Sequence, residues 1–485
     1  MGKVLISFLG TGFPKASLNE PERRYSPFKY RIDGKLYKES SFMAAVLAEH
    51  YKVDRILMIG TVHSMWEEVY HWFQTRNGKK EDDGTSTIYF DIGQYCEQTT
   101  HKTNLEIPHQ DKIEEALGEG SKVLLIKYGL NDEEIRGNIT RILSLQEYLR
   151  NGDELIVDIT HSFRSLPIFI MNLLIYLKNV SSKKITISHI HYGMGEARRE
   201  FKENEDDKEG VAPVVDLKAM MEVQEWITGA YAFREFGNAY KISDLLKAEQ
   251  QDRSAASTLF NFSEAINLNY LYSMQNDFSP LNGIRNWSYQ SDFANLIIPP
   301  IIKSFVNTFN VRQDDCQFPT AKFQLQLADW QFKHKKYGQA YLTSNDALVS
   351  YVCEMSGIGC EYDEREAAKR ILLSMEGRND NEKQIVQRIR NGLNRTLTED
   401  KQKYMRKWFK KHNQCRISIA HMSKVEFKFR WYRNGRERLD EDLHALFPNE
   451  IRNLQQQEGD YMELLPKHMI KLLDEDIKKL KEIIV

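Results

Sequence analysis

An arginine and a histidine near the C-terminus have the chemistry of a site that cleaves RNA. Arg416 and His421 are separated by four residues in the segment Cys415-Arg416-Ile417-Ser418-Ile419-Ala420-His421. A histidine that titrates near neutrality can move protons at the 2′-hydroxyl and at the leaving 5′-oxygen. An arginine can hold two phosphoryl oxygens and stabilise the charge that develops on them. The pair is therefore chemically suited to cleaving an RNA backbone by attack of the neighbouring hydroxyl.

The spacing of this pair restricts how a site can be built. On a helix, residues five apart lie about 140° from each other, so they do not share one face. A site therefore requires either a second copy of the chain or a bend in the helix. The segment before the pair is rich in basic residues with two aromatics among them, which is typical of a surface that binds an RNA backbone and stacks on bases. These residues are Lys401, Lys403, Arg406, Lys407, Trp408, Phe409, Lys410, Lys411 and His412.

The alternative explanation for the Arg–His pair is chance, because the chain contains 67 lysines and arginines and 13 histidines. Two further Arg-Asn pairs, Arg285-Asn286 and Arg390-Asn391, lack a histidine at the required spacing and are discounted. No cluster of Asp, Glu and His accompanies Arg416 and His421, so the sequence does not indicate two-metal hydrolysis. No metal site and no cofactor are predicted.

A second set of candidate residues follows four short apolar runs in the first half of the chain. Ligands of open parallel sheets bind beyond the carboxyl ends of the strands, and loops of small and hydroxyl residues allow backbone N–H groups to approach an anion. Each loop alone is more often structural: His161 could simply cap a helix, and Asp158 is expected to hold the loop backbone. Together the loops predict a nucleotide or phosphate site. The residues expected to contact the ligand are Gly10, Thr11, Gly12, Thr61, Thr160, His161, Ser162, Arg164 and Gly193.

The elements that must position these loops are strands buried on both faces. The apolar runs 4–9, 55–59, 122–127 and 154–159 alternate with helical patterns over 40–50, 135–149 and 169–177, which favours a mainly parallel sheet. Residues 185–192 and 213–217 are expected to close it as a hairpin. Beyond 217, helical periodicity dominates, as over 217–236, 315–337, 341–354 and 467–484, and 425–432 is the only strand-like piece before the turn Asn434-Gly435. We expect an α/β domain over 1–217 and an all-α region over 218–485.

Composition limits the class of protein. The chain has 485 residues, a net charge of −2 and 41% hydrophobic residues, which is typical of a globular protein with two domains. No run of about 18 apolar residues predicts a membrane span. The five cysteines form no CxxC pair, so neither a disulfide framework nor a zinc site is expected. We expect the protein to be located in the cytoplasm, where thiols stay reduced.

Both sets of residues resemble motifs of known families. Asp158-Ile159-Thr160-His161-Ser162 resembles the Asp-x-Thr-His-Gly motif of the CRISPR-associated CARF proteins, and Val4–Gly12 is similar to how those proteins begin. Arg416 and His421 resemble the Arg-x4–6-His motif of HEPN ribonucleases. The resemblance implies a Rossmann-like CARF domain that binds cyclic oligoadenylate, with cyclic tetra-adenylate as the expected ring. It further implies a HEPN domain that cuts single-stranded RNA in type III CRISPR defence, leaving 2′,3′-cyclic phosphates. Both domains are expected to act in a homodimer or a higher even oligomer.

The sequence departs from both motifs, and two other functions stay open. Ser162 stands where CARF proteins usually have glycine, and Ile417 stands where HEPN proteins often have a polar residue, for which Asn413 or Ser418 could substitute. One alternative is a non-catalytic sensor of the same ligand, which would carry a DNA-reading helix-turn-helix. The other is a dinucleotide-dependent enzyme, but Gly10-Thr11-Gly12 lacks the glycine fingerprint such enzymes need.

Overall fold

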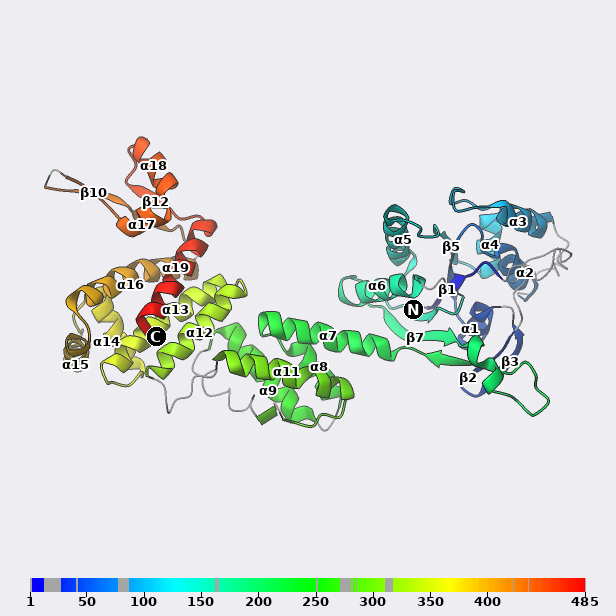
Figure 1. The fold of residues 1–485 in the computed structure, drawn as a ribbon, viewed down its shortest axis with the longest axis horizontal. Coiled ribbons are helices and arrows are strands. Elements are labelled where there is room, and N and C mark those ends of the chain that lie inside the picture. Colours follow the sequence, from blue (N-terminus) through cyan, green and yellow to red (C-terminus); the bar gives the residue numbers. More distant parts are fainter. Residues whose placement is uncertain are drawn as a thin grey trace. The chain divides into compact units, whose positions relative to one another are not determined.

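The computed structural model of the chain describes residues 2–12, 28–40, 42–76, 87–161, 165–249, 252–270, 281, 283–284, 286–309, 317–421, 423–434 and 436–484 (Figure 1). The chain divides into two compact units, Met1–Gln224 and Glu225–Val485. None of the helices that the structure describes has the length and apolar content needed to cross a bilayer.

The first unit consists of alternating strands and helices. Its strands are β1 (Lys3–Leu9), β2 (Phe28–Ile32), β3 (Lys35–Ser40), β4 (Arg55–Gly60), β5 (Lys122–Leu125), β6 (Glu154–Asp158), β7 (Thr186–Gly193) and β8 (Ala212–Asp216). Its helices are α1 (Met43–Tyr51), α2 (Trp66–Arg76), α3 (Thr87–Gln98), α4 (Gln110–Leu117), α5 (Asp132–Ser144) and α6 (Leu166–Asn179), with short 3-10 helices η1 (Leu145–Tyr148) and η2 (Gly195–Glu200). The helix α7 (Ala219–Phe236) leads into the second unit.

All eight strands form one mainly parallel sheet in the order β3-β2-β8-β7-β6-β1-β4-β5. Alternate residues of the central strands enter two separate cores. Leu5 and Ile156 pack in the core that includes α1, α2, α3 and α4, whereas Ile6 and Val157 pack in the core that includes α5 and α6. Burial on both faces explains why these strands appear in the sequence as continuous apolar runs. The predicted fold class, an α/β domain followed by a helical region, is confirmed.

The predicted closing hairpin is also confirmed, since β7 and β8 pair antiparallel. A second hairpin, β2–β3, was missed, although Phe28–Ile32 alternates and is followed by Asp33-Gly34. Both turn residues have positive φ, 48° and 79°, which is the geometry that Asp-Gly favours in a tight hairpin.

The second unit is mostly helical and contains two hydrophobic cores. One core includes α7, α8 (Tyr240–Ala248), α9 (Arg253–Leu268), α11 (Asp292–Phe309) and part of α12 (Pro319–Lys333). The other includes the rest of α12, α13 (Tyr337–Met355), α14 (Tyr362–Leu373), α15 (Asp380–Thr396), α16 (Glu399–Ala420) and α19 (Pro466–Ile484). The helix α12 takes part in both cores and so joins them.

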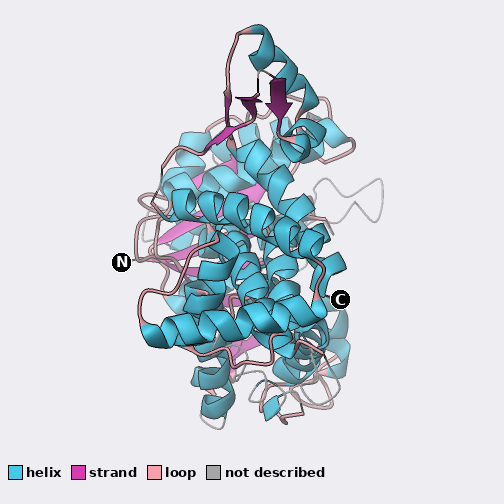
Figure 2. Cartoon of the chain, turned by 90° about the vertical axis from the view of Figure 1, so that its left-hand side faces the viewer, coloured by secondary structure: helices cyan, strands magenta, loops and turns pink. Residues whose placement is uncertain are grey.

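The segment between α16 and α19 differs from the prediction of one strand over 425–432. It contains β9 (Glu426–Lys428), β10 (Arg430–Arg433), β11 (Arg436–Leu439), α17 (Glu441–Leu446), α18 (Pro448–Gln456) and β12 (Tyr461–Glu463), with the short strands visible among the helices at the top of Figure 2. Phe429 lies where the pairing partner changes: its backbone N–H donates to the Asp460 carbonyl next to β12, at 3.0 Å, and its carbonyl accepts the Asp440 N–H next to β11, at 2.8 Å. The pieces on either side then pair with different partners, β9 with β12 and β10 with β11.

Candidate functional site

The loops singled out in the first unit lie at one edge of the sheet. The strands β7, β6, β1 and β4 are parallel neighbours, and their registers pair Leu9 with Gly60, Ser7 with Asp158, and Asp158 with His191. The residues that follow these strands, including Thr11, Thr61 and Thr160, therefore lie beyond the same edge. The predicted residues Ser162 and Arg164 lie outside the described residues. Whether this edge binds a ligand stays a prediction.

Asp158 holds the loop at the end of β6, as the sequence predicted. Its two carboxylate oxygens accept hydrogen bonds from the Ser7 hydroxyl, at 2.6 Å, and from the Thr160 backbone N–H, at 2.9 Å. The Thr160 hydroxyl in turn accepts the Gly193 backbone N–H at 2.9 Å. This chain of bonds ties β1, β6 and β7 together at the edge where the ligand is expected.

Thr61 supports the neighbouring loop from inside. It is buried, and its backbone N–H donates to the Ser64 hydroxyl, which donates to the Leu9 carbonyl at 2.8 Å. The Gly10 carbonyl accepts the Met65 N–H at 3.1 Å. Gly12 has a φ of 73°, a conformation that favours glycine. Thr11 is half-buried, so of these loop residues it is better exposed to a ligand than Thr61.

His161 adopts the capping role that the sequence left open. Its Nε2 accepts the backbone N–H of Met43, the first residue of α1, at 3.3 Å. Burial lowers the pKa of the His161 imidazole, although the Asp158 carboxylate acts in the opposite direction. The ring is therefore neutral at neutral pH, as an acceptor at Nε2 requires. A neutral imidazole next to the loop can offer hydrogen bonds to a ligand but no positive charge.

Tyr30 of the unpredicted β2–β3 hairpin reaches the same edge. A Cβ atom at Gly193 would lie 2.8 Å from the Tyr30 ring, so glycine allows the ring to approach β7. The Tyr30 hydroxyl is fully buried and has no hydrogen-bond partner in the described parts of the chain. Burial, with a smaller effect from Asp158, raises the pKa of this phenol well above its usual value. A buried donor without an acceptor is costly, so removing this hydroxyl should not destabilise the domain.

In the second unit, the Arg–His pair lies at the C-terminal end of α16. The helix runs unbroken from Glu399 to Ala420, and His421 is its C-terminal cap, with its N–H donating to the Ile417 carbonyl at 2.9 Å. His421 is exposed and Arg416 is half-buried, with its Nε bonded to the Asn413 side chain at 3.0 Å. Asn413 is therefore the polar neighbour of Arg416, whereas Ser418 is buried.

The basic segment of α16 is only partly the surface that the sequence predicted. Trp408 and Phe409 are buried in the core, so the expectation that they stack on bases is wrong. Trp408 shares a helix face with His412, four residues later, and its indole N–H donates to Asp476 of α19, so this face packs inward. Two lysines of the run are paired with carboxylates: Lys407 lies 2.9 Å from Asp442, and Lys411 lies 2.5 Å from Asp440.

His412 belongs to a network inside the core. Its Nδ1 lies 2.9 Å from an Asp476 oxygen and its Nε2 lies 2.8 Å from the Ser344 hydroxyl. The other Asp476 oxygen accepts the Trp408 indole N–H at 2.7 Å. The order Ser–His–Asp matches that of hydrolase triads. However, His412 and Ser344 are fully buried, so a substrate cannot reach them, and the network joins α13, α16 and α19.

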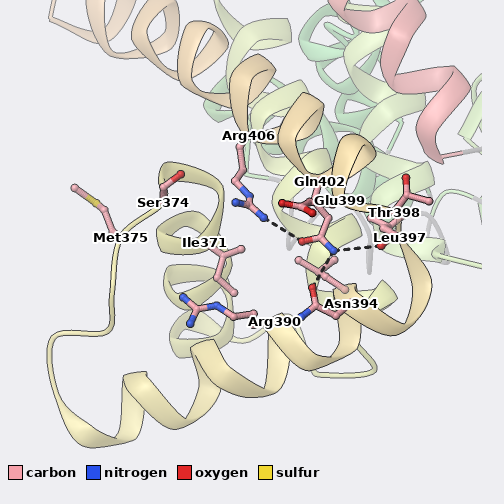
Figure 3. Close-up of a pocket in the computed structure, with 11 residues that line it drawn as sticks. Ile371, Ser374, Met375, Arg390, Asn394, Leu397, Thr398, Glu399, Gln402 and Arg406 are labelled. Atoms are coloured by element: carbon pink, nitrogen blue, oxygen red, sulfur yellow. Dashed lines mark hydrogen bonds between the residues drawn. The ribbon is translucent and has the colours of Figure 1, made fainter.

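A polar pocket of about 730 Å³ lies between α14, α15 and α16. Two arginines from different helices, Arg390 and Arg406, contribute to its lining (Figure 3). Gln402 connects the walls, since it accepts from Arg406 and donates to the Asn394 side chain at 3.1 Å. The charge of the pocket is mixed, because Arg390 is paired with Glu376 at 3.2 Å and Glu399 also contributes to the lining.

Comparisons with known proteins match two parts of the chain. Residues 4–195 match the family model for the CARF domain of the CRISPR system endoribonuclease Csx1. Residues 222–314 match the second domain of CRISPR-associated protein MJ1674. The MJ1674 protein of Methanocaldococcus jannaschii is 33% identical over 387 residues, which are 77% of this chain and 57% of that protein. The matched part thus spans little more than half of that relative.

Proposed function

Since residues 4–195 belong to the CARF domains of CRISPR-associated proteins, as the sequence resemblance predicted, we propose that the chain is a ribonuclease switched on by cyclic oligoadenylate. The observation that carries the proposal is the presence, in one chain, of this domain and of Arg416 and His421 at the end of a basic helix. We propose single-stranded RNA as the substrate. The proposed role of this cleavage is defence by a type III CRISPR system.

The activator site is proposed at the edge of the sheet formed by the ends of β1, β4, β6 and β7. Support comes from Thr160 and Gly193, whose hydrogen bond fixes two of the loops, and from the neutral His161 beside them. Two such edges, one from each protomer of a dimer, would surround a ring with two-fold symmetry. Cyclic tetra-adenylate is the ring we propose, as the resemblance to CARF proteins implies. A ring with an even number of nucleotides can share the two-fold axis of a dimer.

The cleavage site is proposed where two copies of the α16 end meet. His421 is exposed and so can take a proton from the 2′-hydroxyl or supply one to the 5′-oxygen. Arg416 can hold the non-bridging phosphoryl oxygens as negative charge grows on them. The 2′-oxygen bonds to phosphorus, the bond to the 5′-oxygen breaks, and a 2′,3′-cyclic phosphate remains. Ile417, exposed between the two residues, offers an apolar contact for the second copy.

The test is cleavage of a fluorogenic single-stranded RNA with cyclic tri-, tetra- or hexa-adenylate added. A ligand shifts a two-state equilibrium only through its different affinities for the two states, so we expect the right ring to raise cleavage at least about tenfold. Arg416→Ala and His421→Ala should abolish activated cleavage while ring binding is retained. Arg416→Lys should restore little, because lysine cannot form the two-pronged contact. If a ring binds tightly and cleavage never rises, the chain is a non-catalytic sensor.

A further inference from the structure

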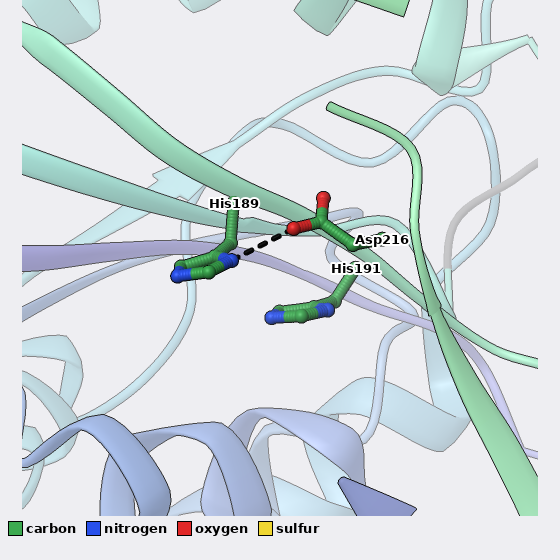
Figure 4. A group of neighbouring side chains, drawn as sticks. All are labelled: His189, His191 and Asp216. Atoms are coloured by element: carbon green, nitrogen blue, oxygen red, sulfur yellow. Dashed lines mark hydrogen bonds and ion pairs between the residues drawn. The ribbon is translucent and has the colours of Figure 1, made fainter. Parts of the chain in front are cut away.

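Two histidines and an aspartate form a compact group on the sheet of the first unit. His189 and His191 lie on the same face of β7, and Asp216 at the end of β8 pairs with His191 in the antiparallel register (Figure 4). One ligand atom from each residue lies within 4.8 Å of those of the other two. Across the described ranges, this is the one group of His, Cys, Asp and Glu with that property.

One ring nitrogen of His191 is buried inside this group. The residue is 4% exposed, and its Nε2 shares a hydrogen bond of 2.7 Å with the Tyr51 hydroxyl. Its Nδ1 is buried without a hydrogen-bond partner in the described part of the chain. A buried ring nitrogen that no hydrogen bond satisfies is expensive, and here it faces the other two residues of the group.

Asp216 presents one oxygen to the histidines and uses the other to hold the backbone. Its Oδ1 accepts the N–H groups of Ile190 at 3.0 Å and Lys218 at 2.9 Å. Its Oδ2 lies 2.7 Å from Nδ1 of His189. The two backbone contacts therefore set the orientation of Asp216 before any ion arrives.

We propose that Nδ1 of His189, Nδ1 of His191 and Oδ2 of Asp216 bind one divalent transition-metal ion, with Zn²⁺ the ion that fits best. Two imidazoles and one carboxylate suit zinc better than magnesium or calcium, and zinc sites with three protein ligands add water as the fourth. The two rings are nearly parallel, with an interplanar angle of 9° and centroids 5.1 Å apart. The His189 ring, rather than the His191 ring that Tyr51 holds, must turn about its Cβ–Cγ bond so that both nitrogens point at one ion.

Tyr51 supplies the second layer of such a site. Histidines that bind metals usually give their other ring nitrogen to a hydrogen-bond partner, which fixes the tautomer and the ring orientation. The Tyr51 hydroxyl does this for His191, and the Tyr51 ring stacks on His189 with centroids 4.8 Å apart. An ion at this place would hold β7 to β8 two residues before Gly193, which belongs to the predicted activator edge.

Metal binding by the full chain tests the proposal directly, and it needs neither activator nor RNA. After dialysis against a chelator, the protein is titrated with Zn²⁺ by calorimetry and with Co²⁺ by visible absorption, which reports four-coordinate nitrogen and oxygen ligands. We expect one ion per chain and a higher Tm with Zn²⁺, because a ligand of the native state stabilises it. His189→Gln and Asp216→Asn should each weaken binding by at least about 100-fold, and Tyr51→Phe by about 10-fold.

The matched control is His109→Asn in the same domain. His109 also pairs with an aspartate, since its Nε2 lies 3.1 Å from Asp91, but it is not part of the group. This variant should bind Zn²⁺ as the parent does. The proposal is overturned if the parent takes up neither Zn²⁺ nor Co²⁺, or if His189→Gln and Asp216→Asn both keep full affinity. Equal loss in His109→Asn would overturn it too, because the effect would then be general destabilisation.

Discussion

Mixing active and inactive chains tests whether the cleavage site needs two copies of α16. The helix is continuous through Arg416, and the cap residue His421 keeps the last turn closed. At 100° per residue the two side chains point about 140° apart and lie about 7.5 Å apart along the axis. One helix therefore cannot direct both groups at the same phosphate. The inactive chain carries Arg416→Ala and His421→Ala together. His421 is exposed and Arg416 is half-buried, so we expect this double variant to fold.

The size of the effect follows from random pairing. If the fraction of wild-type chains is f, wild-type homodimers make up f² of all dimers. At constant wild-type concentration, an equal amount of the double variant should reduce activity to about one half, and a threefold excess to about one quarter. Activated cleavage of a fluorogenic RNA measures this after protomer exchange, which is verified with two affinity tags.

The control chain carries Lys478→Ala, at an exposed lysine that pairs only with neighbours on α19 in the described residues. Adding this competent chain should raise activity in proportion to its amount. If activity with the double variant instead tracks the total number of wild-type chains, each protomer works alone. The geometric argument for a composite site would then be refuted.

Further outcomes are expected. Asp476→Ala should lower the free energy of unfolding by about 2–4 kcal/mol in urea, since it leaves His412 and Trp408 without their acceptor. Tyr30→Phe should leave the Tm unchanged or higher, because the lost hydroxyl has no partner in the described structure; a lower Tm would contradict this. Because burial depresses the pKa of His191 below its usual 6.5, stability should fall as pH drops from about 7 to 5, and His191→Gln should flatten that decline in urea titrations. Cleavage by His189→Gln should be the same with and without EDTA and still leave 2′,3′-cyclic phosphates; metal dependence in this variant would contradict the proposed chemistry.

The central strands could be predicted because the pattern that a buried strand needs lies within a few consecutive residues. A strand buried on both faces needs an unbroken apolar run, and the segments at β1, β4, β5 and β6 have one. The loops after parallel neighbours must then share an edge, which located Thr11 and Thr160 without coordinates. The buried side of α16 was also within reach of the sequence. Met405, Trp408, Phe409 and His412 recur at three- and four-residue spacing, and that pattern outweighs the basic residues between them.

The remaining groups depend on contacts between elements that are far apart in the chain. Neither the pairing of His191 with Asp216 nor the contact of Tyr51 with both histidines has a sequence signature, because the register of β7 with β8 and the packing of α1 decide them. The same holds for His412, whose partners come from α13 and α19. Sequence periodicity determines which face of a helix or strand is buried. Which polar atoms then meet on that face is decided only when the separate elements pack, since hydrogen bonds and metal ligation require positions accurate to a fraction of an ångström.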